Sequence, residues 1–329
     1  MEDNNRLKNS LIALVITLIA LFILNRVMDD YKLRILNLCG IYITLGLSMN
    51  LINGLTGLFS LGHAGFMAVG AYTVAILTMP VAMKDMNFFM KPMVPFLANV
   101  EWGFFPALIM AGIISGFIGF LIGAPVLRLT DDYLAIATLG FAEIIRVVFT
   151  NAQSLTNGAL GLKGIPNSTN IWWSWGVAIL TIVFMEFLMK GSYGKAFKAI
   201  REDEIAARSM GINLFKHKVM SFTFGSFLAG VGGGLLAALL GTIDPNMFRI
   251  ALTFNILLIV VLGGLGSIKG TTISAIIVTI MMEGLRFLDE SINIGPIHIE
   301  GVQGMRMVVF SIILMAVVIV RKEGLLKES

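Results

Sequence analysis

The stretch KGSYGKAFKAIREDEIAARSMGINLFKHK, residues 190–218, decides how this chain is organised. It is densely charged, and it lies between apolar runs that are long enough to cross a membrane. Its charged residues are Lys190, Lys195, Lys198, Arg201, Arg208, Lys216 and Lys218, with Glu202, Asp203 and Glu204. Because Lys and Arg gather in cytoplasmic loops, this basic excess predicts that the segment lies in the cytoplasm. A compact charged loop on one side of a membrane protein also indicates a docking surface.

The composition places the chain among polytopic membrane proteins. Of its 329 residues 57% are hydrophobic and only 13% are charged, and the mean hydropathy is +0.88. These values exclude soluble folds. The net charge of +4 is explained by cytoplasmic loops that face anionic headgroups, so no nucleic-acid partner is predicted. The one cysteine, Cys39, cannot form an intrachain disulfide, and the three histidines lack metal-ligand spacing, so no metal site is predicted.

Ten apolar runs are candidate spans, since a helix needs roughly 20 apolar residues to cross a bilayer. They cover residues 10–25, 33–53, 62–80, 104–127, 132–150, 171–189, 219–241, 251–266, 270–288 and 302–320. The predicted fold is an all-α polytopic membrane protein, with one membrane-spanning domain over residues 1–329 and about ten transmembrane helices. The first run also resembles a signal peptide, but no small-residue cleavage site follows it, so we expect a retained helix.

Counting spans outward from residues 190–218 predicts that both chain ends are cytoplasmic. Basic residues near the two ends agree with this: Arg6 and Lys8, and Arg321, Lys322 and Lys327. The segments that fall outside are poor in Lys and Arg; they are residues 81–103, 151–170, 242–250 and 289–301. The loop at 25–34 fits less well, because it contains three basic residues.

Two glycine-rich stretches, residues 53–65 and 263–270, read as interrupted membrane segments. Non-helical backbone at membrane depth is tolerated only where protein or a water-filled cavity satisfies it, and transport pathways are its usual place. A tight turn between two helices explains the second stretch equally well. Both contain Gly-Leu-x-Ser followed by Leu or Ile, which hints at a repeat, although chance also explains it. The candidate path residues are Gly57, Ser60, Gly62, His63 and Gly65; His63 is equally suited to a structural role at the start of the next helix.

Glu143 and Arg146 lie three residues apart in the fifth span, and Glu283 and Arg286 repeat this spacing in the ninth. An ionised residue near the centre of a spanning helix costs about 2.5–3.5 kcal/mol, so we expect these pairs to face protein rather than lipid. Gly140 shares a helix face with Glu143 and Arg146, where a small residue admits a neighbouring helix. A structural ion pair is the preferred interpretation, and a polar lining of a substrate path is the alternative.

No enzyme motif is present in the sequence. The nearest approach to a Walker A loop, GSYGKAF at residues 191–197, has the wrong spacing and no Ser or Thr after Lys195. Nucleophile-elbow, HExxH and haem motifs are absent as well. We therefore expect neither catalysis nor a cofactor in this chain.

Four blocks, taken in order along the chain, resemble the M-type branched-chain amino-acid ABC permeases (LivM). They are NLINGLTGLFSLGHAGFMAVGAYTVAIL (50–77), YLAIATLGFAEIIRVVFTN with SLTNGALGL (133–162), SYGKAFKAIREDEIAARSMGINLFKHKVMSF (192–222) and VLGGLGSIKGTTISA (261–275). The resemblance covers residues 35–320. It implies a homologous second permease subunit, two cytoplasmic ABC ATPases and an extracytoplasmic substrate-binding protein as partners, in a prokaryotic inner membrane.

The resemblance also implies that residues 190–218 are the coupling loop, with one short helix between Gly194 and Gly211 that contacts an ATPase. The Glu-Ala-Ala…Gly signature of ABC importers appears here with an extra residue and without the Leu-Pro that often follows it. The expected ATPase-coupling residues are Arg201, Glu202, Asp203, Glu204, Ala206, Ala207 and Gly211. A solvated loop that merely joins two spans is the alternative.

The expected function is that of a permease subunit in an ATP-driven importer of branched-chain amino acids, with ATP hydrolysis in partner subunits. Related permeases carry urea, short amides, nucleosides or sugars, and nothing in these helices selects among those substrates. A stand-alone secondary transporter is a further alternative, which the basic loop disfavours. A receptor or scaffold would be expected to have an appended soluble domain.

Overall fold

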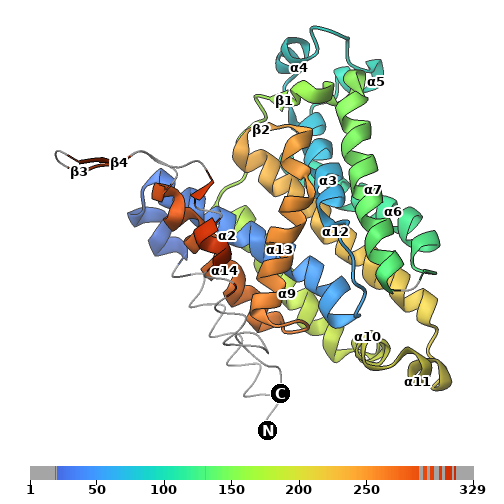
Figure 1. Cartoon of the computed structure of the whole chain (residues 1–329). Coiled ribbons are helices and arrows are strands. Elements are labelled where there is room, and N and C mark those ends of the chain that lie inside the picture. The colour runs from blue at the N-terminus through green and yellow to red at the C-terminus, as the bar shows by residue number, and fades with distance from the viewer. Residues whose placement is uncertain are drawn as a thin grey trace.

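The computed structural model describes residues 19, 21–129, 131–288, 292–294, 297–299, 304, 305, 308–312 and 315. Helices dominate these residues, and the predicted all-α polytopic class is confirmed (Figure 1). The long helices are α2 (Asp30–Met49), α3 (His63–Thr78), α6 (Phe104–Val126), α7 (Asp131–Asn151), α9 (Ile171–Lys190), α12 (Leu214–Leu240), α13 (Ile250–Gly263) and α14 (Ile268–Gly284).

These eight helices coincide with eight of the ten predicted spans, and α12 begins five residues earlier than its predicted range. Most of the first and last predicted spans lies outside the described residues. Within the described part of the chain, five helices are long and apolar enough to cross a membrane. A sixth is added if α3 and α4 (Val81–Asn87), which meet at a bend of 120°, form one span. The structure therefore supports several spans without reaching the predicted count of ten.

The centre of the bundle is built from α2, α3, α6 and α12. In the 18-residue apolar stretch of each helix, 78% of the residues are buried in Asp30–Leu55, which contains α2, and in α12. The share is 22% in α7 and 28% in α9. Glycine makes this close packing possible, because a Cβ added at Gly70 of α3 would collide with the Gly230 backbone of α12. Gly233 of α12 meets the Met67 backbone in the same way. Helices α7 and α9 lie at the edge of the bundle and expose most of their surface.

Three of the four segments predicted to lie outside gather at one end of the bundle, namely residues 81–103, 151–170 and 242–250 (Figure 1). Here lie α4, α5 (Pro95–Ala98), α8 (Gln153–Thr156), η2 (Gly158–Leu160), η3 (Pro245–Phe248) and the short strand pair β1 (Leu162–Lys163) and β2 (Thr242–Ile243). The Asn87 side chain joins α4 to β1 by accepting from the backbone N–H of Lys163 at 2.9 Å and donating to its carbonyl at 2.8 Å. Lys84 donates to the carbonyls of Leu97, at 2.8 Å, and Val100, and its burial lowers the pKa of the amine.

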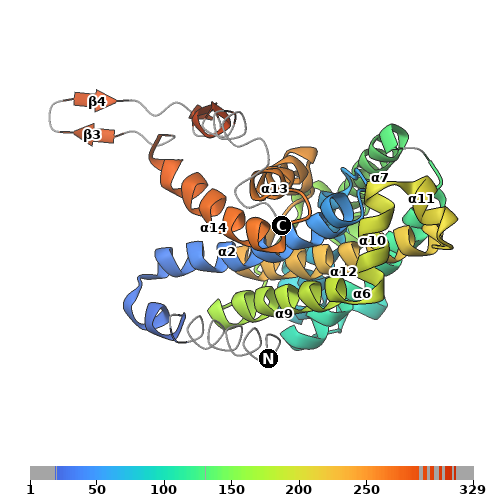
Figure 2. The same ribbon diagram turned by 90° about the horizontal axis from the view of Figure 1, so that it is seen from below.

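A second strand pair, β3 (Ile292–Ile294) with β4 (Ile297–Ile299), follows α14 and η4 (Leu285–Leu288). The opposite end of the bundle carries α10 (Ser192–Glu202) and α11 (Glu204–Ser209). In Figure 2 they lie beside those ends of α2, α9 and α12 that are predicted to be cytoplasmic. The charged stretch of residues 190–218 thus forms one compact structure at a single end of the molecule.

Candidate functional site

The charged segment folds as two helices, not as the single coupling helix that the sequence led us to expect. The backbone of Asp203 is extended, with φ −159° and ψ 111°, and this breaks the helix between α10 and α11. The Asp203 carboxylate then caps α11 by accepting from the backbone N–H groups of Ile205 at 2.8 Å and Ala206 at 3.0 Å. An aspartate at this position satisfies donors that would otherwise have no partner at a helix start. Asp203 is therefore a structural residue of the segment.

The two helices present different faces to the bundle and to solvent. Phe197 and Ile200 of α10 are buried, and Ile200 forms a small apolar cluster with Ala207 of α11 and Leu214 of α12. On α11, by contrast, Ile205 is 80% exposed, and Met210, which follows the helix, is 83% exposed. Both apolar side chains are open to solvent on a charged surface and are free to contact a protein partner. The sequence analysis did not single out either residue, although both are apolar and lie outside the buried Phe197–Ile200–Ala207 face.

Gly211, the glycine of the predicted coupling signature, ends α11. Its φ is +82°, a left-handed conformation that favours glycine. The backbone N–H of Gly211 donates to the carbonyl of Arg208 at 3.0 Å, and that of Ile212 to the carbonyl of Ala207 at 3.1 Å. This pair of hydrogen bonds is the Schellman arrangement of a helix C-terminus. The signature glycine thus fixes where the chain leaves α11.

We expect Gly211→Ala to loosen α11, because an L-residue in the left-handed region costs about 1–2 kcal/mol. The backbone amides of residues 205–212 are expected to exchange with deuterium about tenfold faster than in the wild type. Gly191→Ala is the matched control, since Gly191 has φ −77° and space for a methyl group. Unchanged exchange in Gly211→Ala would show that α11 is held by contacts other than its C-terminal turn.

Arg201 connects the charged segment to both glycine-rich stretches. Its Nη1 donates to the carbonyl of Gly54 at 3.1 Å, and its stem lies against Gly57, where an added Cβ would be 3.0 Å from Cγ of Arg201. The same Nη1 atom occupies the space that a side chain at Gly266 would need. Gly57 and Gly266 have φ of +77° and +86°, so both turns depend on glycine. One side chain of α10 therefore touches two turns that are far apart in sequence.

Asn50 joins the helical segment before the first turn to the second turn. Its Oδ1 accepts from the backbone N–H of Gly266 at 2.8 Å, and its Nδ2 donates to Ser267 O at 3.1 Å and Thr271 Oγ1 at 3.0 Å. Asn50 is fully buried and begins η1 (Asn50–Leu55), a π-helical end of α2. Single π-helical turns occur often at functional sites. The sequence analysis missed Asn50, although a buried amide directly before the first glycine-rich stretch is a visible signal.

The first glycine-rich stretch is a true interruption, because residues 56–62 are not helical. Its backbone is satisfied by side chains: Asn53 donates to Ser60 O at 3.1 Å, and Leu61 N–H donates to Thr138 Oγ1 at 3.0 Å. The first turn of α3 is satisfied by another helix, since Ala64 N–H donates to Thr253 Oγ1 at 3.0 Å. The second stretch is a tight turn between α13 and α14, the alternative that the sequence left open.

The remaining candidate path residues are buried where helices meet. His63 Nε2 lies 2.7 Å from Ser48 Oγ, which gives the imidazole a partner within α2. A Cβ added at Gly62 would be 2.9 Å from Thr138 O, and one at Gly65 would be 2.9 Å from Ala142 Cα. Gly62 and Gly65 therefore let α7 approach the start of α3, which gives these two glycines a packing role.

Glu143 and Arg146 form the expected ion pair but do not face the interior of this chain. Arg146 Nε donates to the Glu143 carboxylate at 2.9 and 3.0 Å. The Glu143 side chain is nevertheless 52% exposed, and a Cβ added at Gly140 would meet open space. Helix α7 turns this face away from α3 and α6, so the pair is not enclosed by the helices of this chain. The expectation that it faces protein rather than lipid stays a prediction. Glu283 and Arg286 pair in the same way, at 3.1 Å, with Tyr31 donating to Glu283 at 2.9 Å.

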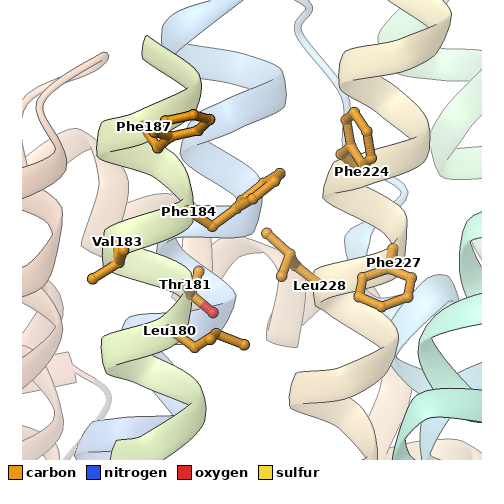
Figure 3. A pocket seen from close by; sticks show the side chains of 8 residues that line it. All are labelled: Leu180, Thr181, Val183, Phe184, Phe187, Phe224, Phe227 and Leu228. Atoms are coloured by element: carbon orange, nitrogen blue, oxygen red, sulfur yellow. The ribbon is translucent and has the colours of Figure 1, made fainter. Parts of the chain in front are cut away.

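A wide apolar groove separates α9 from α12 (Figure 3). It encloses about 500 Å³ and is lined by Leu180, Thr181, Val183, Phe184, Phe187, Phe224, Phe227 and Leu228. Thr181 supplies the polar side chain of this lining, and its hydroxyl donates to Val177 O of its own helix at 2.8 Å. A groove of this kind suits hydrocarbon chains better than a polar solute.

The candidate functional site is the junction of α10, η1 and the two glycine turns, where Arg201 and Asn50 connect the charged segment to the membrane helices.

Comparison with known proteins identifies the family. The family described as branched-chain amino acid transport system, permease component, matches residues 31–318. The chain belongs to this permease family. It is 34% identical to the high-affinity branched-chain amino acid transport system permease protein LivM of Salmonella typhimurium, over 88% of this chain and 71% of that protein. Against LivM of Escherichia coli the identity is 35%, over 76% of this chain and 62% of that protein.

A more distant relative is the probable branched-chain amino acid transport permease protein LivM of Methanocaldococcus jannaschii, which is 26% identical over 72% of this chain. No solved structure matches the chain. Membership in this permease family confirms the LivM resemblance and makes the chain a multi-pass membrane subunit of an ABC transporter.

Proposed function

We propose that this permease imports branched-chain amino acids, driven by two cytoplasmic ABC ATPases and supplied by an extracytoplasmic binding protein. Its relatives named for this transport support the substrate class, and the match to the family over most of the chain supports the partners. The whole chain acts as one permease domain in a prokaryotic inner membrane, with both termini in the cytoplasm. ATP hydrolysis takes place in the partner subunits.

The contact between Arg201 and the two glycine turns carries this proposal. ATPases that close beneath α10 and α11 displace these helices, and Arg201 passes the displacement to Gly54 and Gly266. From there the Asn50 side chain links it to α2 and α14. The glycine-rich stretch of residues 57–65 is thereby coupled to the ATPase and borders the translocation path. The predicted coupling residues Glu202, Glu204 and Ala206 lie on the α10–α11 surface that would face the ATPases. Glu202 forms an ion pair with Arg201, and Glu204 forms one with Lys218.

The second permease packs on α7. Residues Ile136, Ile144 and Val148 expose 52–66% of their area on this helix, next to the Glu143–Arg146 pair. A charged pair at membrane depth requires a protein neighbour, and the open space at Gly140 admits one closely. Glu143 and Arg146 therefore lie at the contact between the two permeases, where the pair stabilises the complex.

The exposed apolar residues on and after α11 give a direct test of ATPase docking. Cysteines at Ile205 and Met210 are expected to crosslink to the ATPase in the assembled complex and to react with membrane-impermeant reagents only from the cytoplasm. A cysteine at Met86, which is 72% exposed in α4 at the opposite end, is the matched control and is expected to react only from outside. Labelling of position 205 from outside intact cells would contradict both the docking site and the orientation.

Uptake of radiolabelled leucine, isoleucine and valine by proteoliposomes that contain the complete complex and its binding protein tests the substrate. Urea, ribose and a nucleoside serve as comparison solutes in the same vesicles. We expect ATP-dependent accumulation of the three amino acids alone. Accumulation without ATP would indicate a secondary transporter, and preference for another solute would overturn the substrate class while leaving the permease assignment intact.

A further inference from the structure

A second charged site lies beside the coupling helices, between α11, the end of α6 and the start of α12. It encloses about 350 Å³ and is lined by Leu127, Arg128, Leu129, Glu204, Arg208, Leu214, Phe215 and Lys218. Its lining combines three basic side chains and one carboxylate with apolar residues. The pocket adjoins the coupling residues through Glu204, but neither of its arginines has a part in the proposed transport function.

The charges in the pocket are unbalanced. Lys218 is only 8% exposed and forms an ion pair with Glu204, which neutralises the one carboxylate of the lining. The Arg128 guanidinium lies 5.3 Å from the centre of the Phe215 ring, a cation–π contact that leaves its charge in place. Arg208 lies four residues after Glu204, on the same side of α11. Two arginines thus remain to attract an anion.

The position of the pocket favours a ligand with both a phosphate and apolar chains. It sits where α6 ends and α12 begins, at the end of the bundle that carries α10 and α11 (Figure 1). Leu121 and Phe117 of α6, which ends two residues before Arg128, are 54% and 60% exposed and lie on one row of that helix. Basic pockets between spanning helices near the membrane surface bind anionic lipid headgroups.

We propose that this pocket binds the phosphate of an anionic phospholipid, with Arg128 and Arg208 contacting the headgroup and the acyl chains lying along the exposed face of α6. The ion pair between buried Lys218 and partly exposed Glu204 forms the wall of the site and holds α11 against α12. A bound lipid would then brace the coupling helices from the membrane side. The exposed apolar residues Ile205 and Met210 do not line the pocket and remain available to a protein partner.

Native mass spectrometry of the full-length permease, offered equal amounts of phosphatidylglycerol and phosphatidylcholine in detergent, tests this inference. The wild type is expected to retain phosphatidylglycerol preferentially. In the double variant Arg128→Gln, Arg208→Gln this preference is expected to fall by about tenfold or more, because each basic residue near the membrane surface contributes roughly 1 kcal/mol to anionic lipid binding. Lys195→Gln, Lys216→Gln is the matched control, since both lysines are exposed, lie outside the lining and remove the same charge.

Two outcomes would overturn the proposal. If glycerol 3-phosphate displaces phosphatidylglycerol at equal concentration, the pocket recognises a soluble phosphate and the acyl chains contribute nothing. If the arginine double variant keeps its lipid preference but loses copurifying ATPase, the pocket contacts an acidic protein surface instead. Both readouts are independent of substrate identity, so they stand whether or not branched-chain amino acids are the cargo.

Discussion

Arg201→Met is expected to lower ATP-driven uptake about tenfold or more while ATPase binding persists, because a hydrogen bond to a charged group is worth roughly 1.5–3 kcal/mol. Methionine keeps the apolar stem that lies against Gly57 but removes the donor that holds Gly54 O. The ATPases would still dock on α11 and hydrolyse ATP, whereas the glycine turns would no longer follow α10. The measurement is the ratio of solute transported to ATP hydrolysed in proteoliposomes.

Lys195→Met is the matched control for this experiment, because Lys195 is exposed on the same helix and lies away from the glycine turns. Its coupling ratio is expected to match the wild type. Arg201→Lys keeps the charge but lacks the rigid fork that bonds Gly54 O and the Glu202 carboxylate together, so an intermediate ratio is expected. Full coupling in Arg201→Met would place the connection between ATPase and membrane helices elsewhere.

The Glu143–Arg146 pair gives the second large effect. Each of Glu143→Ala and Arg146→Ala is expected to reduce the yield of the complex with the second permease by about tenfold or more, because a lone charge at membrane depth costs roughly 2.5–3.5 kcal/mol. The combined change Glu143→Gln, Arg146→Met leaves no uncompensated charge and is expected to restore most of the yield.

Copurification from detergent with a tag on this chain measures the effect, alongside uptake by the reconstituted complex. Glu186→Ala on α9 provides a control for the loss of any single membrane-helix carboxylate. A double variant that assembles fully but does not transport would place the pair in the substrate path. Single variants that assemble and transport normally would exclude both roles.

The sequence predicted the fold class and the positions of most helices because apolar runs and basic loops are dictated by the membrane itself. It also located the charged segment and the interrupted stretch at residues 53–65. It did not predict that Asp203 splits the segment into two helices, since a capping aspartate inside a helical pattern looks like one more surface charge. Nor did it predict which way α7 faces, because Glu143 and Arg146 pair equally well on a buried or an exposed face.

The central contact could not be predicted from one sequence. The sequence analysis names Arg201 only as one of seven expected ATPase-coupling residues, and only the three-dimensional arrangement brings it to Gly54 and Gly266. Asn50 illustrates the same limit, since its partners lie more than two hundred residues away. Periodicity reports which face of an element is buried, but it does not report which distant segment covers that face.

The π-helical end of α2, η1, offers a way for the chain after it to rotate relative to α2. A π-turn holds one more residue than an α-turn, so conversion of η1 to an α-helix would shift the following residues by one position. One position in an α-helix corresponds to a rotation of about 100°. Pulling on the Gly54 carbonyl would then twist the chain that leads into residues 56–62, instead of dragging α2 along its axis. A small displacement of α10 would thus become a rotation of the backbone at residues 56–62, while α2 keeps its packing against the neighbouring helices.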